Sequence, residues 1–285
     1  MSAFKNLLSV PVVLACAVSL ARGAEEIPFK VDKIESGTAC RIVAVNRSFA
    51  PVTVMAGMVA GAYQYRSNRA WPLRDVIAPN SSREIARIYA ERNRTPCGAE
   101  MAYSHSVGDA FAVPDRHYRY FLPFREGTVA RVTQEPTGVL GTHKDALSRY
   151  AVDFGVPLGT TVLAARAGTV IEVRDRFDEG RPDPRLAEKT NLVSILHSDG
   201  TFAQYAHLAP RSIVARPGER VEAGQMIGKS GNTGFAGGPH LHFDLRRARI
   251  GVDGVVRQES LPFAFFRQKS GKKITLKQQM RITAD

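Results

Sequence analysis

The chain of 285 residues is predicted to be mainly β, with a small sandwich-like domain followed by a larger β-sheet domain. β-Branched residues alternate with polar ones in segments such as residues 41–59, and clusters of Gly, Pro, Asn and Asp separate these segments. The composition, 44% hydrophobic and 23% charged, is that of a globular chain. Short alternating segments joined by turns predict strands rather than long helices.

The first 23 residues have the features of an export signal. Lys5 precedes an almost wholly apolar run over residues 6–20, and small residues flank Arg22 in Ala21-Arg22-Gly23, where cleavage is expected. The run is shorter than the ~20 residues that cross a bilayer, so no stable membrane span is expected after cleavage. We therefore expect a protein of the periplasm, the cell envelope or the medium. A lipoprotein with Cys16 as its anchor is the less favoured alternative, because the apolar run continues past that cysteine.

Residues 24–125 are expected to form the N-terminal β domain. Of the three cysteines in the chain, Cys40 and Cys97 remain after cleavage, and an even pair in an exported domain suggests one disulfide, with two buried thiols as the alternative. Residues 82–92 interrupt the strand pattern and suggest a short helix with Ser82 as its N-cap.

No catalytic cluster is visible in this first domain. His105 and His117 are isolated in it and are expected to be structural. The domain could position a substrate, block a groove, or bind another protein of the envelope, and the sequence does not choose among these roles.

The net charge of the chain is +12, and removal of the signal, which carries Lys5 and Arg22 but no acid, lowers it to +10. A basic exported protein meets anionic wall polymers, phospholipid headgroups and extracellular nucleic acid. Because no motif combines aromatic and basic residues, and because export separates the protein from most nucleic acid, we expect no nucleic-acid partner.

Residues 126–268 are expected to form the second domain, and residues 269–285 a basic, solvated tail. "HSDG" at 197–200 indicates a hairpin turn between two strands. Residues 175–189 are polar without a core pattern and are expected to form an exposed loop.

"AGQMIGKS" at 223–230 matches a permissive phosphate-loop pattern. The nine residues after it contain four glycines and a proline. Such a segment cannot begin the helix that a phosphate loop requires, since each glycine costs about 1 kcal/mol and proline about 3 kcal/mol relative to alanine. We therefore interpret the match as accidental.

A group of histidines and one acid carries the chemical signal of the chain. His240 and His242 lie in "GGPHLHF", and on a strand residues i and i+2 face the same side, so both imidazoles converge. Catalytic zinc needs three protein ligands and an open position. Asp153, in "YAVDF", can supply a carboxylate, and His207, in "QYAHL", an uncoordinated imidazole that could move protons.

Three segments, residues 150–173, 191–208 and 218–243, resemble successive blocks of the lysostaphin/LytM-type zinc endopeptidases, and the resemblance extends over residues 138–246. It implies a compact antiparallel β fold with a narrow groove. It also implies cleavage of peptide bonds in the stem peptides or cross-links of bacterial peptidoglycan.

The resemblance assigns Asp153 and His242 as zinc ligands, and His207 and His240 as the catalytic histidines beside the metal. The common pattern of the family puts the first zinc histidine where this chain has Arg149. The nearest candidate for that ligand is His143, in "GTHKDALSRYAVDF", because members with "YAVDF" often carry a displaced histidine.

The expected function is therefore that of an exported zinc metalloendopeptidase that hydrolyses peptidoglycan through a metal-activated water. Which of the two catalytic histidines takes the proton stays open, and His197 is interpreted as structural. The alternative is a non-catalytic peptidoglycan-binding or regulatory protein on the same fold, which Arg149 favours.

Overall fold

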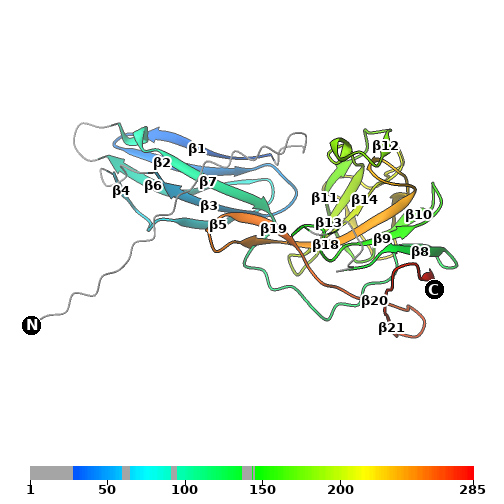
Figure 1. Cartoon of the computed structure of the whole chain (residues 1–285). Coiled ribbons are helices and arrows are strands. Elements are labelled where there is room, and N and C mark those ends of the chain that lie inside the picture. The colour runs from blue at the N-terminus through cyan, green and yellow to red at the C-terminus, as the bar shows by residue number, and fades with distance from the viewer. Residues whose placement is uncertain (1–27, 60–64, 91–94, 137–142, 144) are drawn as a thin grey trace, which may run out of the picture.

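The computed structural model describes residues 28–59, 65–90, 95–136, 143 and 145–285, so the export signal expected at residues 1–23 lies outside the described residues. Two β units lie side by side, an N-terminal unit in blue and cyan and a C-terminal unit in green to red (Figure 1). In the described part of the chain, no helix combines the length and apolar character needed to cross a membrane.

The N-terminal unit is a sandwich of two antiparallel sheets with the strand orders β1-β2-β6-β4 and β5-β3-β7. Its core contains side chains of both sheets, such as Ile42 of β2 and Val54 of β3, which are fully buried. The strand bounds are Phe29–Ser36 (β1), Ala39–Asn46 (β2), Val52–Met58 (β3), Tyr65–Ser67 (β4), Leu73–Ile77 (β5), Ser81–Ala90 (β6) and Met101–Val107 (β7).

The helix expected over residues 82–92 is wrong, because residues 82–90 belong to β6 and the last two residues of that expectation lie outside the described residues. The pairing of β6 with β2 shifts by one residue between Ile42 and Val43, which leaves Ile85 without a partner of its own. Such a bulge moves the alternation of side chains by one position. Ile85 and Ile88 are thereby both buried, and their spacing of three imitates a helix.

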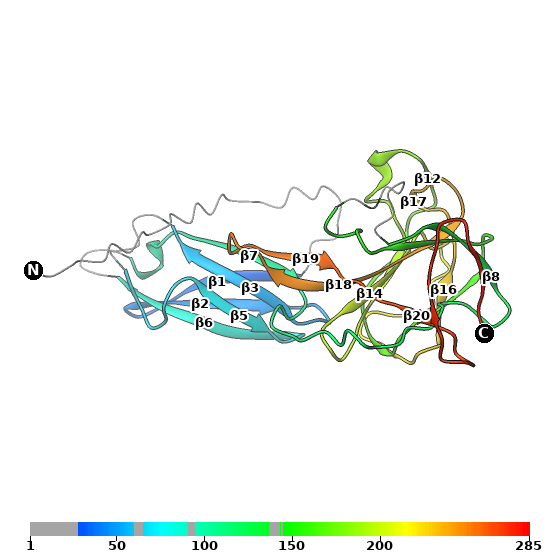
Figure 2. The same cartoon turned by 60° about the horizontal axis from the view of Figure 1, so that its bottom comes forward.

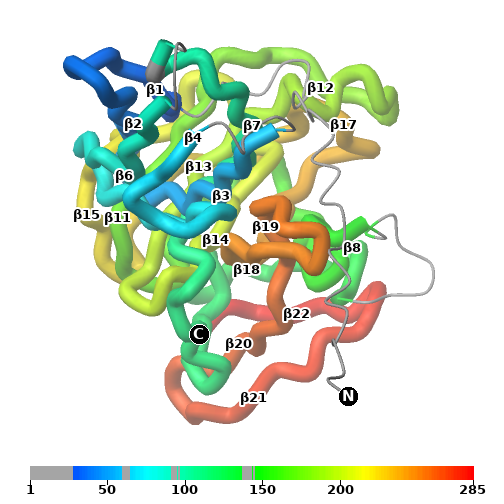
Figure 3. Tube along the Cα trace, turned by 90° about the vertical axis from the view of Figure 1, so that its left-hand side faces the viewer, coloured from blue at the N-terminus to red at the C-terminus, as the bar shows by residue number. Residues whose placement is uncertain are grey.

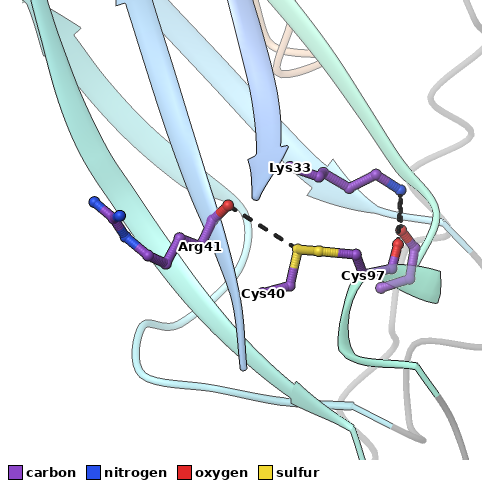
Figure 4. The surroundings of a disulfide bond; sticks show 5 residues. Lys33, Cys40, Arg41 and Cys97 are labelled. Atoms are coloured by element: carbon purple, nitrogen blue, oxygen red, sulfur yellow. Dashed lines mark hydrogen bonds between the residues drawn. A yellow bond between two sulfur atoms is a disulfide. The ribbon is translucent and has the colours of Figure 1, made fainter. Parts of the chain in front are cut away.

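The N-terminal unit contains the disulfide suggested by the sequence, between Cys40 on β2 and Cys97 on the short 3-10 helix η2 (Pro96–Gly98), with the two Cα atoms 4.9 Å apart (Figure 4). Lys33 donates hydrogen bonds of 3.0 Å to the carbonyls of Cys97 and Ala99. The disulfide therefore links two segments of this unit and does not reach the C-terminal unit.

The C-terminal unit is built on a nine-stranded antiparallel sheet of order β15-β11-β13-β14-β18-β9-β8-β22, with β19 also paired to β18. One face of this sheet packs on the main hydrophobic core, which includes Phe154, Tyr205 and Phe243. The bounds are Val129–Gln134 (β8), Val152–Gly155 (β9), Gly168–Arg174 (β11), Leu192–Leu196 (β13), Phe202–Ala206 (β14), Arg220–Val221 (β15), His240–Ile250 (β18), Val256–Ser260 (β19) and Arg281–Thr283 (β22).

Three two-stranded sheets complete this unit: β10–β16, β12–β17 and β20–β21. Their bounds are Thr161–Leu163 (β10), Gly180–Arg181 (β12), Met226–Lys229 (β16), Gly234–Phe235 (β17), Phe265–Phe266 (β20) and Lys273–Ile274 (β21).

Residues 175–189, expected to be an exposed loop, contain β12 and the 3-10 helix η3 (Pro184–Leu186). β12 pairs in parallel with β17, so this segment is joined to the glycine-rich segment before His240. A Cβ atom at Gly180 would overlap the carbonyl oxygen of Asn232, which explains why glycine occupies this position.

The expectation of a solvated tail over residues 269–285 is wrong for its last strand. β22 pairs with β8, and Ile282 and Ala284 are buried in the main core. In Figure 3 the segment with β20 to β22, in orange and red, lies on the side of the molecule away from β12 and β17. Basic residues are still exposed on it because they alternate with the buried positions.

The hairpin formed by β18 and β19 joins the two units. β19 lies beside β7 of the sandwich (Figure 2), and the amide of Val256 donates a hydrogen bond of 3.1 Å to Ser104 Oγ. Because β18 begins at His240 and continues into this hairpin, one strand runs from the candidate site to the N-terminal unit.

Candidate metal centre

The histidines of β18 face the side of the sheet opposite to the core. Between them, Leu241 is fully buried in the core, as the alternation of a strand requires. The antiparallel pairing of β18 with β9 sets His242 opposite Asp153 and His240 opposite Gly155. This register brings the carboxylate of Asp153 next to the imidazole of His242.

Three side chains converge at this point. His242 Nδ1 lies 2.9 Å from Asp153 Oδ1, and His143 Nε2 lies 3.3 Å from Asp153 Oδ2. All three ligand atoms lie within 4.8 Å of one another. Donors at zinc-bonding distance in a tetrahedral site are about 3.3–3.5 Å apart. Two imidazoles and a carboxylate at these separations can therefore hold a metal ion.

His143 is brought into the cluster by the loop between β8 and β9. Asp145 Oδ1 accepts hydrogen bonds from the amides of Leu147 (2.7 Å) and Ser148 (3.0 Å), which forms a compact turn. The amide of Ser260 donates a bond of 2.8 Å to the carbonyl of Ala146 and ties this turn to β19.

Arg149 occupies the position where the family has its first zinc histidine. It is exposed on the turn after His143, and its amide donates to the carbonyl of Asp145 at 3.1 Å. His143 belongs to the convergent group, whereas Arg149 does not line the hollow around that group. The geometry thus favours His143 over the Arg149 position as the place of the third donor.

Asp244 is a fully buried acid behind the cluster that the sequence analysis did not select. His242 Nε2 lies 3.0 Å from Asp244 Oδ2, and Arg246 donates two hydrogen bonds to the same carboxylate at 2.8 and 2.7 Å. Since an ionised carboxylate only accepts, Nε2 carries a hydrogen toward Asp244, so the nitrogen of His242 that could release its proton and bind a metal is Nδ1. Its position two residues after His242 on a strand was the available signal.

On the other side of Asp153, Gln134 at the end of β8 donates a hydrogen bond to Oδ2. Gln134 is opposite Asp153 in the pairing of β8 and β9. The carboxylate is thus oriented by the neighbouring strand as well as by the two histidines.

Burial and charge act against each other in this group. Burial disfavours a charged imidazole, but hydrogen bonds and attraction from Asp153 and Asp244 outweigh it and raise the pKa of His242 to about 9. Burial also opposes ionisation of Asp153, yet hydrogen bonds from His143 and His242 hold its pKa well below its usual range. The metal-free cluster therefore contains an anionic Asp153 and a protonated His242 at neutral pH.

His207 and His240 form a second pair of imidazoles, with ring centroids 4.5 Å apart, and the His207 ring is 5.9 Å from that of His242. His207 follows β14 with φ of 61°, a left-handed conformation that is uncommon outside glycine and often found at functional sites. Burial, followed by the neighbouring His240 and His242, lowers the pKa of His207 to about 3, so its ring is neutral at pH 7.

The tautomers of this second pair follow from their partners. His207 Nδ1 lies 2.7 Å from the carbonyl oxygen of Thr233, and His240 Nδ1 lies 2.8 Å from that of Gly238. A carbonyl can only accept, so in each ring Nδ1 carries a hydrogen. In both rings Nε2 keeps the lone pair and can accept a proton.

The five candidate site residues line one hollow of about 670 Å³, and Asp244 lies outside it. These five residues are His143, Asp153, His207, His240 and His242. Thr133 and Gln134 line it on the β8 side, and residues 235–239 and Arg174 are also in its wall. Phe235 of β17 is 40% exposed and gives the wall an apolar surface. The hollow has the size and the mixed lining of a site for a small molecule or a short peptide.

The structure places the other histidines away from the hollow. His197 is buried with Nδ1 2.9 Å from the carbonyl of Ala167, and burial lowers its pKa to about 4. His105 stacks on Phe29 in the sandwich, and His117 is exposed.

Lys229, which ends β16, and Ser230 are the last residues of the phosphate-loop pattern, and no helix begins after them. Ser230 Oγ donates 2.8 Å to the carbonyl of Pro157, so its role here is in the turn.

Residues 148–254 match the model of peptidase family M23. The matched segment includes Asp153, His207, His240 and His242. His143 precedes it, so the assignment of His143 rests on the geometry of the cluster.

Curated relatives agree with this family. The chain is 38% identical over 173 residues to the peptidoglycan DD-endopeptidase ShyA of Vibrio cholerae. The match covers 59% of this chain and 36% of the relative. The glycyl-glycine endopeptidase ALE-1 of Staphylococcus capitis is 32% identical over 130 residues, or 45% of this chain and 31% of the relative.

Lysostaphin of Staphylococcus simulans is 33% identical over 116 residues, or 40% of this chain and 21% of the relative. The chain thus spans 36% or less of the length of each of these three relatives.

Proposed function

We propose that this protein is an exported zinc metalloendopeptidase that hydrolyses peptide bonds in bacterial peptidoglycan. The observation that carries the proposal is the convergence of His143, Asp153 and His242 in one hollow, with their ligand atoms within 4.8 Å, opposite the pair His207 and His240. The family match and the convergence point to the same chemistry from independent grounds.

The residues of the cluster fit a zinc ion. His143 would bind through Nε2, Asp153 through its carboxylate, and His242 through Nδ1, which Asp244 leaves free by holding Nε2. Three protein ligands leave a fourth position open, as catalytic zinc requires. Zinc in such a site supplies Lewis-acid activation of water and of the scissile carbonyl.

The second histidine pair does the proton chemistry in this proposal. One of His207 and His240 accepts the proton of the attacking water at Nε2, because Nδ1 of each ring is held by a carbonyl. The resulting imidazolium then donates that proton to the leaving nitrogen. The low pKa of His207 favours donation, since burial makes its cation release a proton readily.

The substrate class is supported by the relatives, whose names include a peptidoglycan DD-endopeptidase and a glycyl-glycine endopeptidase. Export is supported by the disulfide between Cys40 and Cys97, since such bonds persist in oxidising compartments. In this proposal residues 24–125 are the first domain, which also offers a surface for an envelope partner, and the second domain begins at residue 126 and includes β22.

The test measures metal content and hydrolysis by the zinc-loaded chain. We expect about one zinc per chain. We also expect release of soluble fragments from purified peptidoglycan, which chromatography detects. His143→Ala should lose both, because it removes one of three ligands. His117→Ala, which removes an exposed histidine outside the hollow, should keep both.

Two outcomes would overturn the proposal. Zinc-loaded protein that cuts neither intact peptidoglycan nor isolated cross-linked peptides would exclude the activity. Absence of zinc from both the unchanged chain and His143→Ala would instead favour the non-catalytic wall-binding protein.

A further inference from the structure

Three pairs of arginines face each other across antiparallel strands in the described part of the chain. Like charges directly opposite on neighbouring strands destabilise a sheet. The pairs are Arg41 with Arg87, Arg249 with Arg257, and Arg131 with Arg281.

Two of these pairs are neutralised by acids within the fold. Glu84 lies between the arginines of the first pair, with bonds of 2.6 and 3.0 Å from Arg41 Nε and Arg87 Nε. In the second, Arg249 bonds to Glu259 at 2.8 Å, and Arg257 bonds to Asp253 at 2.8 and 2.6 Å. The positive charges of these two arginine pairs are therefore compensated by acids of the same chain.

The third pair is not compensated. Arg131 on β8 and Arg281 on β22 are both exposed, and neither has an ion pair or a side-chain hydrogen bond with any residue that the structure describes. Two guanidinium groups side by side form a fork that matches a carboxylate.

The position of this pair relates it to the hollow. Ala130, Val132 and Ile282 turn into the core, so the alternating Arg131 and Arg281 stand on the opposite face, where Asp153 and His242 also stand. The hollow reaches Thr133 of the same strand. The arginine pair thus lies on the same face of the sheet as the metal centre, beyond the β8 side of the hollow.

The register gives the distance from the reacting groups. Arg281 is opposite Arg131, Arg131 is opposite Gly155, and Gly155 is opposite His240, so all lie in one row across four strands. With strands about 4.8 Å apart, Arg131 is roughly 10 Å and Arg281 roughly 14 Å from His240 along the sheet. An extended peptide covers this span in about three to four residues.

We propose that Arg131 and Arg281 form a subsite that binds a free carboxylate of the substrate peptide, about three to four residues from the bond that is cut. This rests on the proposed function, and it defines the substrate as an acidic peptide that runs across the strands from the metal centre toward β22. The last strand of the chain thereby takes part in substrate selection.

The test compares two cross-linked stem peptides that are identical except that the carboxylates of one are amidated. The zinc-loaded full chain should have a KM about tenfold lower for the carboxylate form, with kcat unchanged, since this contact is made equally before and during the reaction. Arg131→Gln and Arg281→Gln should each lose this preference. Arg257→Gln, an arginine of a compensated pair, should keep it.

A second variant separates binding from folding. Arg281→Glu places an acid opposite Arg131, so the melting temperature should stay the same or rise while the preference for the carboxylate form disappears. If the unchanged chain does not distinguish the two peptides, or if Arg131→Gln and Arg281→Glu retain the preference, the subsite is excluded.

A binding experiment distinguishes failure of the subsite from failure of the proposed function. It measures equilibrium binding of the same two peptides after the scissile amide has been reduced to an amine, which cannot be hydrolysed. A tenfold preference in binding that depends on both arginines, without hydrolysis of the natural peptides, would support the subsite and contradict the peptidase. Hydrolysis of both peptides at equal rates, with no preference in binding, would support the peptidase and contradict the subsite.

Discussion

The two β units bury polar groups in different ways. In the sandwich, the buried Asp75 is paired with Arg69 at 2.6 Å and with Arg83, and the side-chain amide of the buried Asn46 donates to the carbonyl of Ala50 at 2.8 Å. These groups are satisfied within the chain, which is the usual condition of buried polar groups.

In the C-terminal unit, polar groups are lined up from the partly buried Arg246 through Asp244 and His242 to Asp153, and the line ends at a hollow. Imidazole and carboxylate lone pairs from separate strands meet there. The comparison teaches that buried polarity alone does not mark a site in this protein. Convergence of ligand atoms on one point marks it.

The largest expected effect concerns the sandwich alone. Replacing both Cys40 and Cys97 by serine should lower the free energy of unfolding of the N-terminal unit by about 2–5 kcal/mol, because the unfolded chain regains freedom over the loop that the bond closes. Chemical denaturation followed with and without a reductant measures this change.

The affinity for zinc is the control for the disulfide. Since the bond lies within the sandwich, the serine variant should bind zinc as tightly as the unchanged chain. A parallel loss of zinc affinity would show that the two units are coupled through the hairpin of β18 and β19, and the contrast between them would fail.

A smaller effect tests the line of groups behind the metal centre. Asp244→Asn should weaken zinc binding about 10–100-fold, because a neutral amide holds His242 Nε2 less firmly and no longer favours the tautomer that leaves Nδ1 free. Competition with a chelator measures the affinity, and melting of the metal-free protein measures any general damage.

Asp199→Asn is the matched control for this change. Asp199 is also paired with an arginine, Arg166, at 2.8 Å in the same unit, but its hydrogen-bond partners, Arg166, Thr201 and Asp115, include none of the proposed zinc ligands. If Asp244→Asn lowers only the melting temperature, as Asp199→Asn would, Asp244 has a purely structural role.

The smallest effect, about tenfold in zinc affinity per pH unit, comes from protonation of His242. Because the pKa of His242 is raised from 6.5 to about 9 in the metal-free fold, zinc must displace one proton below that pH. The affinity should therefore increase from pH 6.5 to about 9 and then level off. Titrations with zinc at several pH values measure the slope.

The stability of the metal-free protein should change in the opposite direction. A raised pKa contributes stability that is complete below 6.5 and is lost as the pH rises through about 9. An affinity independent of pH, or a metal-free fold that becomes more stable toward pH 9, would contradict the assigned charge of His242.

Much of the fold and the candidate site could be predicted from local patterns. The spacing of His240 and His242 predicted a shared face, and the resemblance selected Asp153 and His207, which the structure brings to the same hollow. The helix over residues 82–92 failed because a bulge in β6 imitates helical spacing. A bulge depends on the partner strand, so no pattern within the segment reveals it.

Strands, turns and a histidine pair on one face depend on neighbours along the chain, so they could be predicted from residue patterns alone. Contacts between distant residues could be read only from the folded chain. His143 reaches Asp153 beside a turn held by Ser260, Gln134 orients Asp153 from β8, and Arg281 lies in one row with His240. These contacts depend on strand register, and register is set by packing across the whole sheet rather than by neighbours along the chain.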